Sequence, residues 1–121
     1  MKKIPILYLN SILIASIQTE LTDEEVLSFQ SELLKKNNKL MAKGVIIDVS
    51  TLDVIDSYMA KVLGDLTTMV KLQGSAFLLC GVKPAVSSTL VDMGMMLTKI
   101  DTFLSLEKAF NFLTSNDRKF Q

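Results

Sequence analysis

The sequence predicts a single α/β domain, built on a mixed, mainly parallel β-sheet with an antiparallel hairpin at its amino terminus and about four helices. Short apolar runs of strand length alternate with longer amphipathic segments, which is the pattern of parallel strands joined by helical crossovers. The first two apolar runs are separated only by Asn10 and Ser11, so they fit a hairpin instead. A chain of 121 residues buries about two-thirds of its unfolded surface, enough for one core. We therefore expect one domain over residues 1–121.

The hairpin strands are predicted at residues 4–9 and 12–17, both rich in isoleucine and leucine. Lys2 and Lys3 before this stretch superficially resemble the start of an export signal. The polar pair at residues 10–11 interrupts the stretch, however, and no small-x-small cleavage pattern follows it. No apolar run reaches the roughly 18 residues that a membrane-spanning helix needs. The hairpin is therefore favoured, and no membrane partner is expected.

The first helix is predicted to begin at a capping box. Thr22 and Glu25 have the required spacing, and the acidic residues Asp23 and Glu24 suit the positive end of the helix. One face of the helix is apolar apart from Asn37. Glycine commonly ends helices, so Gly44 is predicted to end this one.

The remaining elements continue the alternation. A strand at 45–49 should be buried on both faces, and a helix should follow from about Ser57 to Gln73. Further strands are expected at 75–80 and 102–104, with helices from Pro84 to about Asp92 or Met93 and from Ser105 onward. The apolar stripe of the second helix is predicted to comprise Met59, Val62, Leu63, Leu66, Met69 and Val70.

Composition excludes several classes of function. Thirteen basic and thirteen acidic residues give zero formal charge, which argues against a general nucleic-acid binder. The chain has no histidine, so Ser-His-Asp and Cys-His catalysis are absent, as are the commonest zinc sites. One cysteine cannot form an intrachain disulfide and suits a reducing compartment, so a cytoplasmic location is expected. We expect no enzyme activity, no cofactor and no metal.

The sequence disfavours three other kinds of site: the magnesium site of a receiver domain, a reactive thiol and a phosphate-binding loop. Asp48, Asp53 and Asp56 could suggest the magnesium site of a receiver domain, but no acidic pair follows the first strands, where that fold requires one. Cys80 has no histidine to activate it and is predicted to be an inert core thiol. The glycines Gly74, Gly81 and Gly94 do not form a phosphate-binding loop.

One loop is a candidate for function because it follows a central strand, at the sheet edge where sites of open α/β folds gather. It spans residues 48–57 and leads into the second predicted helix, with either Asp56 or Ser57 as the N-cap. Local sequence leaves two interpretations open. These residues only cap the helix, or Ser57 carries a phosphate that the helix amino terminus stabilises.

Four segments carry a resemblance to a known family. They are KIPIL (3–7), SIQTEL (16–21), GVIIDVSTLDVIDSYMAKVLG (44–64) and KPAVSSTLVDMG (83–94). With the order of elements, they resemble the STAS domain (anti-anti-sigma) family, most closely its RsbS-type stressosome antagonists. The resemblance implies a STAS fold, with Ser57, the serine that follows Asp56, as a phosphorylation site.

The resemblance also implies a function. The chain would be a non-catalytic phospho-switch and scaffold of a bacterial stressosome, which sequesters an RsbT-like serine kinase and releases it when Ser57 is phosphorylated. An RsbR-like STAS co-antagonist would share the oligomeric assembly, and a phosphatase would reset it. We expect the partner-binding loop to comprise Asp53, Asp56, Ser57, Tyr58 and Lys61.

The alternative is a simple anti-sigma factor antagonist, which binds an anti-sigma kinase without forming a large particle. Assembly contacts could come from the hairpin or from Met93, Met95, Met96 and Leu97, since methionine-rich surfaces adapt to partners. Ordinary core packing of these residues is the competing interpretation.

Overall fold

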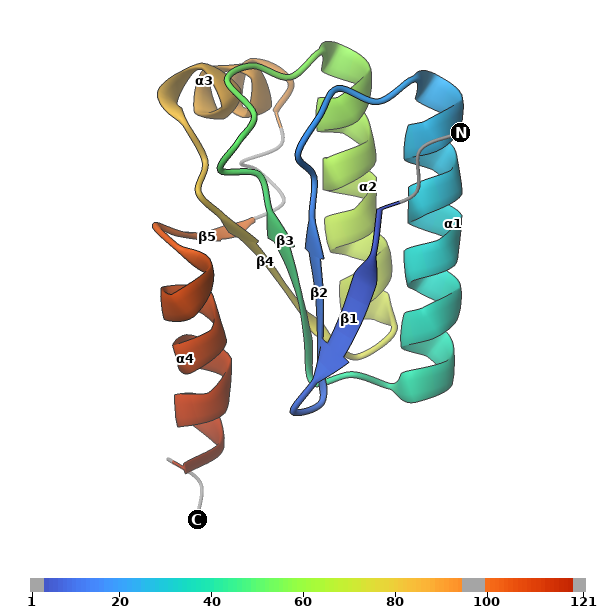
Figure 1. Cartoon of the computed structure of the whole chain (residues 1–121), viewed down its shortest axis with the longest axis vertical. Coiled ribbons are helices and arrows are strands. Elements are labelled where there is room, and N and C mark those ends of the chain that lie inside the picture. The colour runs from blue at the N-terminus through green and yellow to red at the C-terminus, as the bar shows by residue number, and fades with distance from the viewer. Residues whose placement is uncertain (1–3, 95–99, 119–121) are drawn as a thin grey trace.

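A computed structural model describes residues 4–94 and 100–118, with side chains described through residue 115. The chain forms one five-stranded sheet in the order β1-β2-β3-β4-β5 (Figure 1). The strands are β1 (Ile6–Leu9), β2 (Ile12–Ser16), β3 (Gly44–Asp48), β4 (Ala76–Cys80) and β5 (Asp101–Phe103). The helices are α1 (Asp23–Leu40), α2 (Ser57–Leu72), α3 (Pro84–Asp92) and α4 (Leu106–Arg118). The predicted fold class is confirmed.

The amino-terminal hairpin forms as predicted. β1 pairs with β2 antiparallel, with Leu9 opposite Ile12, while every other pair in the sheet is parallel. Asn10 and Ser11 have φ angles of 51° and 65°, the left-handed pair that a two-residue turn needs to match the strand twist. The polar pair in the sequence therefore marks a tight turn.

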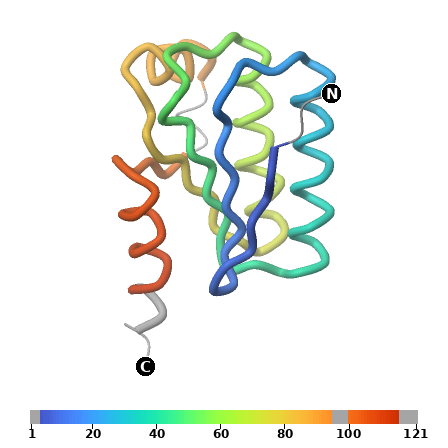
Figure 2. Tube along the Cα trace, in the orientation of Figure 1, coloured from blue at the N-terminus to red at the C-terminus, as the bar shows by residue number. Residues whose placement is uncertain are grey.

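The sheet lies between two layers of helix. Helices α1 and α2 cover one face, and α4 covers part of the other, as the tube in Figure 2 also shows. Side chains along β3 alternate between these layers, because successive residues of a strand point to opposite faces. Val45 and Ile47 pack toward α1 and α2, whereas Ile46 packs with Leu113 of α4. β3 is thus buried on both faces, as its continuous apolar run predicted.

The start of α1 is confirmed and its predicted end is wrong. The Glu25 N–H donates to the Thr22 hydroxyl at 3.1 Å, and the Thr22 N–H donates to the Glu25 carboxylate at 2.9 Å. The helix stops at Leu40, where Met41 adopts a left-handed φ of 50°. Gly44 instead begins β3, where a Cβ atom would lie 2.6 Å from Leu113 Cδ1. A side chain at this position would press on Leu113, so the glycine allows α4 to pack closely.

The predicted stripe of α2 is also shifted at one position. Met69 is exposed, whereas Thr67 is buried and donates its hydroxyl to the Leu63 carbonyl at 2.9 Å. Both residues lie at the borders of the apolar face, about 80° on either side of its centre at 100° per residue. The threonine border of α2 therefore faces the core, and its methionine border faces solvent.

The polar residue on the apolar face of α1 holds three segments together. Asn37 donates to the side chains of Gln73 at 2.8 Å and Ser75 at 3.0 Å, and accepts from the Ala42 N–H at 3.2 Å. Ser75 donates to the Ala42 carbonyl at 2.6 Å. Buried polar groups are tolerated when they are satisfied in this way. The network fixes the carboxyl ends of α1 and α2 to each other.

A close approach between loops occurs at Gly81. Its φ is +73°, and a Cβ atom there would lie 2.8 Å from the Cα of Ser50. The loop after β4 thus touches the loop after β3 backbone to backbone. Gly74 has a φ of +92° but open space around its missing side chain.

The predicted assembly residues are only partly described. Met93 is 39% exposed, which leaves part of its side chain available on the surface. Met95, Met96 and Leu97 lie outside the described residues.

We expect Asn37→Ala to lower the free energy of unfolding by about 1–3 kcal/mol, because Ser75 and the Ala42 N–H lose a buried partner. Asn38→Ala is the matched control, since Asn38 is an exposed neighbour on the same helix. It should be neutral or slightly stabilising because alanine is the better helix former. Urea denaturation measures both. Equal effects of the two changes would contradict a structural role for the network.

We expect Gly81→Ala to destabilise the domain more than Gly74→Ala. Both changes place a side chain at positive φ, at a cost of about 1–2 kcal/mol. Only the first also drives a Cβ into the Ser50 backbone, which adds about 1–3 kcal/mol. Thermal and urea unfolding of the pair separate the two costs. If both variants lost the same stability, the loop contact would not matter energetically.

Candidate functional site

The candidate site lies where the loops after β2, β3 and β4 meet. These strands are parallel, so their carboxyl ends reach the same edge of the sheet, at the top of Figure 1. The Thr51 hydroxyl donates to the Ile17 carbonyl at 3.2 Å, which joins the first two loops. The Val49 N–H donates to the Cys80 carbonyl at 3.0 Å, which holds the base of the middle loop against β4. The loop that leads into α2 is anchored on both sides.

The structure resolves which residue caps α2. Asp56 is the N-cap, and its Oδ1 accepts from the Met59 N–H at 2.7 Å. Ser57 is the first residue of the helix and is exposed. Of the two capping candidates, the aspartate does the capping, so the Ser57 hydroxyl is not needed for that bond.

A salt bridge fixes the middle of the loop. Lys83 Nζ lies 2.7 Å from Asp53 Oδ1, although the two residues are 30 positions apart. The hydrogen bond from Lys83, and then its charge, lower the pKa of the fully exposed Asp53 carboxyl. Lys83 is the residue before α3, so this pair ties the loop after β3 to the start of that helix. Asp53 therefore stays ionised, with its negative charge partly offset by Lys83, a pairing that its sequence neighbours did not indicate.

The other predicted partner-binding residues follow the start of α2. Lys61 is exposed, and its Nζ lies 3.1 Å from Asp65 Oδ2. Ser57, Lys61 and Asp65 are spaced four residues apart and form what we call the α2 outer face. Tyr58 is only partly accessible, because it packs against the core. Four of the five predicted residues are thus exposed together, and Tyr58 is half-buried.

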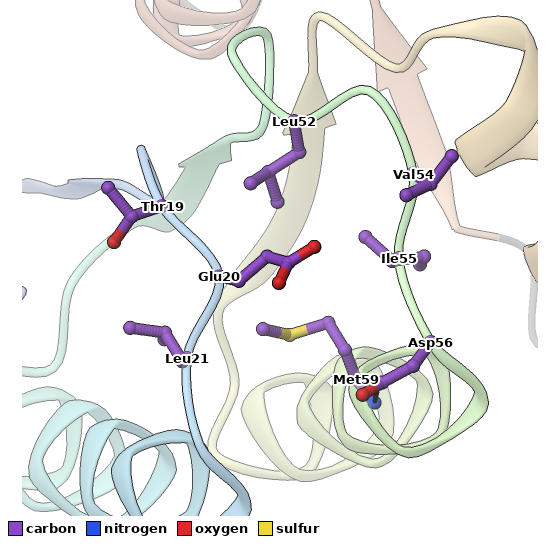
Figure 3. Close-up of a pocket in the computed structure, with 8 residues that line it drawn as sticks. All are labelled: Thr19, Glu20, Leu21, Leu52, Val54, Ile55, Asp56 and Met59. Carbon is purple, nitrogen blue, oxygen red and sulfur yellow. Dashed lines mark hydrogen bonds between the residues drawn. The ribbon is translucent and has the colours of Figure 1, made fainter.

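A pocket of about 340 Å³ adjoins this site. Figure 3 shows the Glu20 side chain directed into the space between Leu52 and Met59, with Asp56 at the start of α2 across that space. The lining residues are Thr19, Glu20, Leu21, Leu52, Val54, Ile55, Asp56 and Met59. Sequence reasoning missed the contribution of the loop after β2. Parallel pairing of β2 with β3 is the signal that could have found it.

Three further properties of the described residues bear on the chemistry available to the domain. Burial first, and then the Asp48 carboxylate, raise the pKa of the Cys80 thiol to about 12, so it is not a nucleophile. Over the described ranges, no group of three acidic or cysteine side chains is placed to hold a metal ion. Within the same ranges, no helix has the length and apolar character to cross a membrane.

Comparisons with known proteins find a family model and solved structures that are similar to this chain. The family model described as the STAS domain matches residues 4–109. A solved structure of RsbS from Moorella thermoacetica, carrying a serine-to-glutamate change, is 35% identical with a TM-score of 0.88. It covers 97% of this chain and 99% of that one. A structure described as the molecular architecture of the stressosome, a signal integration and transduction hub, is 37% identical with a TM-score of 0.84. That match covers 94% of this chain and 99% of the other.

A curated relative from Bacillus subtilis (strain 168) is the RsbT co-antagonist protein RsbRA, 27% identical over 108 residues. The match covers 88% of this chain but 38% of that protein, so the chain spans well under half the length of this relative. Two relatives above 30% identity match along almost their full length, and the family model covers most of the chain. The chain belongs to the STAS domain family.

Proposed function

We propose that this protein is a non-catalytic phospho-switch and scaffold of a stressosome, with Ser57 as the modified residue. One observation carries the proposal: Ser57 is exposed at the first residue of α2, while Asp56 makes the capping bond. A kinase can approach such a hydroxyl without unfolding the helix. The exposed side chains of Asp53, Asp56 and Lys61 surround it as the partner-binding surface.

The relatives support this assignment. The RsbS protein of Moorella thermoacetica has been given a glutamate in place of a serine, which is a change that imitates a phosphate charge. A second relative is part of the stressosome, and the curated one is a co-antagonist of RsbT. By this likeness, the partners of the chain are an RsbT-like serine kinase, an RsbR-like STAS protein and a phosphatase, in the cytoplasm.

Charge provides the switching mechanism. A phosphate on Ser57 adds about −1.5 to −2 charges at neutral pH. Asp56 lies beside it and accepts a backbone bond through one oxygen, so its own charge remains near the phosphate. The kinase surface that fits the unmodified loop would then face a strongly acidic helix start. A binding loss of about 3 kcal/mol is a weakening of roughly a hundredfold, which releases the kinase without any change of fold.

We expect Ser57→Glu to weaken binding of the cognate switch kinase by roughly a hundredfold, which isothermal titration calorimetry measures. Ser57→Ala should bind as the wild type does and remain bound after ATP is added. Ser28→Glu is the matched control, because Ser28 is exposed on α1, away from the site, and should leave the affinity unchanged. The proposal fails if Ser57→Glu binds as tightly as the wild type, or if phosphopeptide mapping finds Ser57 unmodified by kinase and ATP.

The hairpin offers a surface for assembly. Leu7 is 62% exposed and Leu9 is 54% exposed on the edge strand β1. No charged residue occurs between positions 4 and 19, so this edge lacks the charges that commonly protect exposed strands from pairing. The proposed scaffold role uses this edge for contacts with another STAS unit.

We expect native mass spectrometry to show a large particle when the chain is mixed with an RsbR-like paralogue. Leu9→Lys should reduce that particle because a charge is placed on the bare edge. Leu104→Lys is the matched control, since Leu104 is 81% exposed directly after β5, the strand at the opposite edge of the sheet. A strict monomer, alone and with the paralogue, would exclude the scaffold and favour the simple anti-sigma factor antagonist.

A further inference from the structure

The α2 outer face carries a lysine between a serine and an aspartate. Residues four apart on a helix lie one turn above each other, within reach of side-chain ion pairs. Lys61 is therefore placed to reach either Ser57 on its amino-terminal side or Asp65 on its carboxyl-terminal side. In the unmodified chain it pairs with Asp65, at 3.1 Å between Nζ and Oδ2. The side chains of Lys61 and Asp65 are 62% and 43% exposed, so this pair is weakly held.

We propose that Lys61 is the counter-ion of phosphorylated Ser57, and that phosphorylation transfers this lysine from Asp65 to the phosphate. The inference rests on the proposed function, because it requires a phosphate at Ser57. It adds a second change to the switch, the loss of the Lys61–Asp65 ion pair on the α2 outer face.

Three physical reasons favour the phosphate over the aspartate. The phosphate carries nearly twice the charge of a carboxylate and presents three acceptor oxygens. An anion on the amino-terminal side of a lysine four residues away is the better orientation for an ion pair on a helix. The phosphate also lies at the positive end of α2, whereas Asp65 lies in its interior. The lysine can exchange partners by rotating its own side chain.

The other charged groups near the start of α2 also have partners, so position on the helix, and not availability, singles out Lys61. Lys83, on the neighbouring loop, pairs with Asp53 at 2.7 Å. Asp56 accepts from the Met59 N–H at 2.7 Å and would repel the phosphate. Lys61 is the cation that the helix itself places one turn from the modified residue.

The transfer moves a charge signal along the helix. When Lys61 turns toward the phosphate, Asp65 loses its partner, although it is eight residues from the modification. Eight residues of α-helix span about 12 Å. A kinase lying along the α2 outer face would therefore meet new negative charge at both ends of that stretch, and not only at Ser57.

The test uses the full chain with phosphoserine installed at position 57 by genetic code expansion, so that no kinase is needed. Phosphorus NMR titration then gives the second pKa of the phosphate, which is ordinarily about 6. Lys61→Gln should raise this pKa by about 0.3 units, the value of one pair of this kind. Asp65→Asn should lower it, because the competing carboxylate is gone. Lys35→Gln, at an exposed site far along α1, is the matched control and should not move it.

A second readout follows the lysine. At neutral pH, NMR contacts of the Lys61 side chain should lie toward Asp65 in the unphosphorylated chain and move toward residue 57 in the phosphorylated one. Equal phosphate pKa values in the wild type, Lys61→Gln and Asp65→Asn would overturn the transfer. Because phosphoserine is installed directly, this result is separate from whether a kinase modifies Ser57, which is the question that decides the proposed function.

Discussion

The parallel register of β2, β3 and β4 is the constraint on which the site depends. Ser16 lies opposite Asp48, and Asp48 lies opposite Cys80, so the three strands end level with one another. Their following loops must then leave the sheet side by side. The contacts from Thr51 to Ile17 and from Lys83 to Asp53 are made across these loops. The loop after β3 has bonds of its own, such as that from the Ser50 N–H to the Asp48 carboxylate, and the contacts to its neighbours add to them.

A division of roles between two adjacent residues underlies both functional proposals. Asp56 satisfies a backbone donor at the start of α2, which leaves the next side chain available at the surface. Had the serine been the cap, its hydroxyl would have been bonded to the backbone and turned toward the helix. The arrangement combines a helix start that is already stabilised with a hydroxyl that an enzyme can reach. The lysine one turn later adds the cation that a new anion requires.

Much of the fold was predictable because local sequence signals agreed with the structure that the whole chain adopts. The capping box at Thr22, the turn at Asn10 and the apolar run of β3 each specify their own structure within a few residues. The end of α1 was mispredicted because Gly44 has a tertiary role, the approach of Leu113, that resembles a helix stop in sequence.

The site was less predictable because it depends on tertiary contacts that local sequence does not show. Aspartate and serine cap helices about equally well, so the choice between Asp56 and Ser57 needed coordinates. Glu20 and Lys83 reach the site from loops far away in sequence, and only the order of the strands brings them there. The proposal of Ser57 as the modified residue came from the family resemblance, since its sequence neighbours alone fitted a plain helix cap.

The shielded thiol of Cys80 has a consequence for signalling. Oxidants such as peroxide attack thiolates that solvent can reach, and this cysteine is buried, with a pKa of about 12. It is also the only cysteine in the chain. The domain is therefore indifferent to redox conditions that would modify an exposed thiol. Under the proposed function, an oxidative stimulus would have to be detected by another component and reach this domain as a change in phosphorylation.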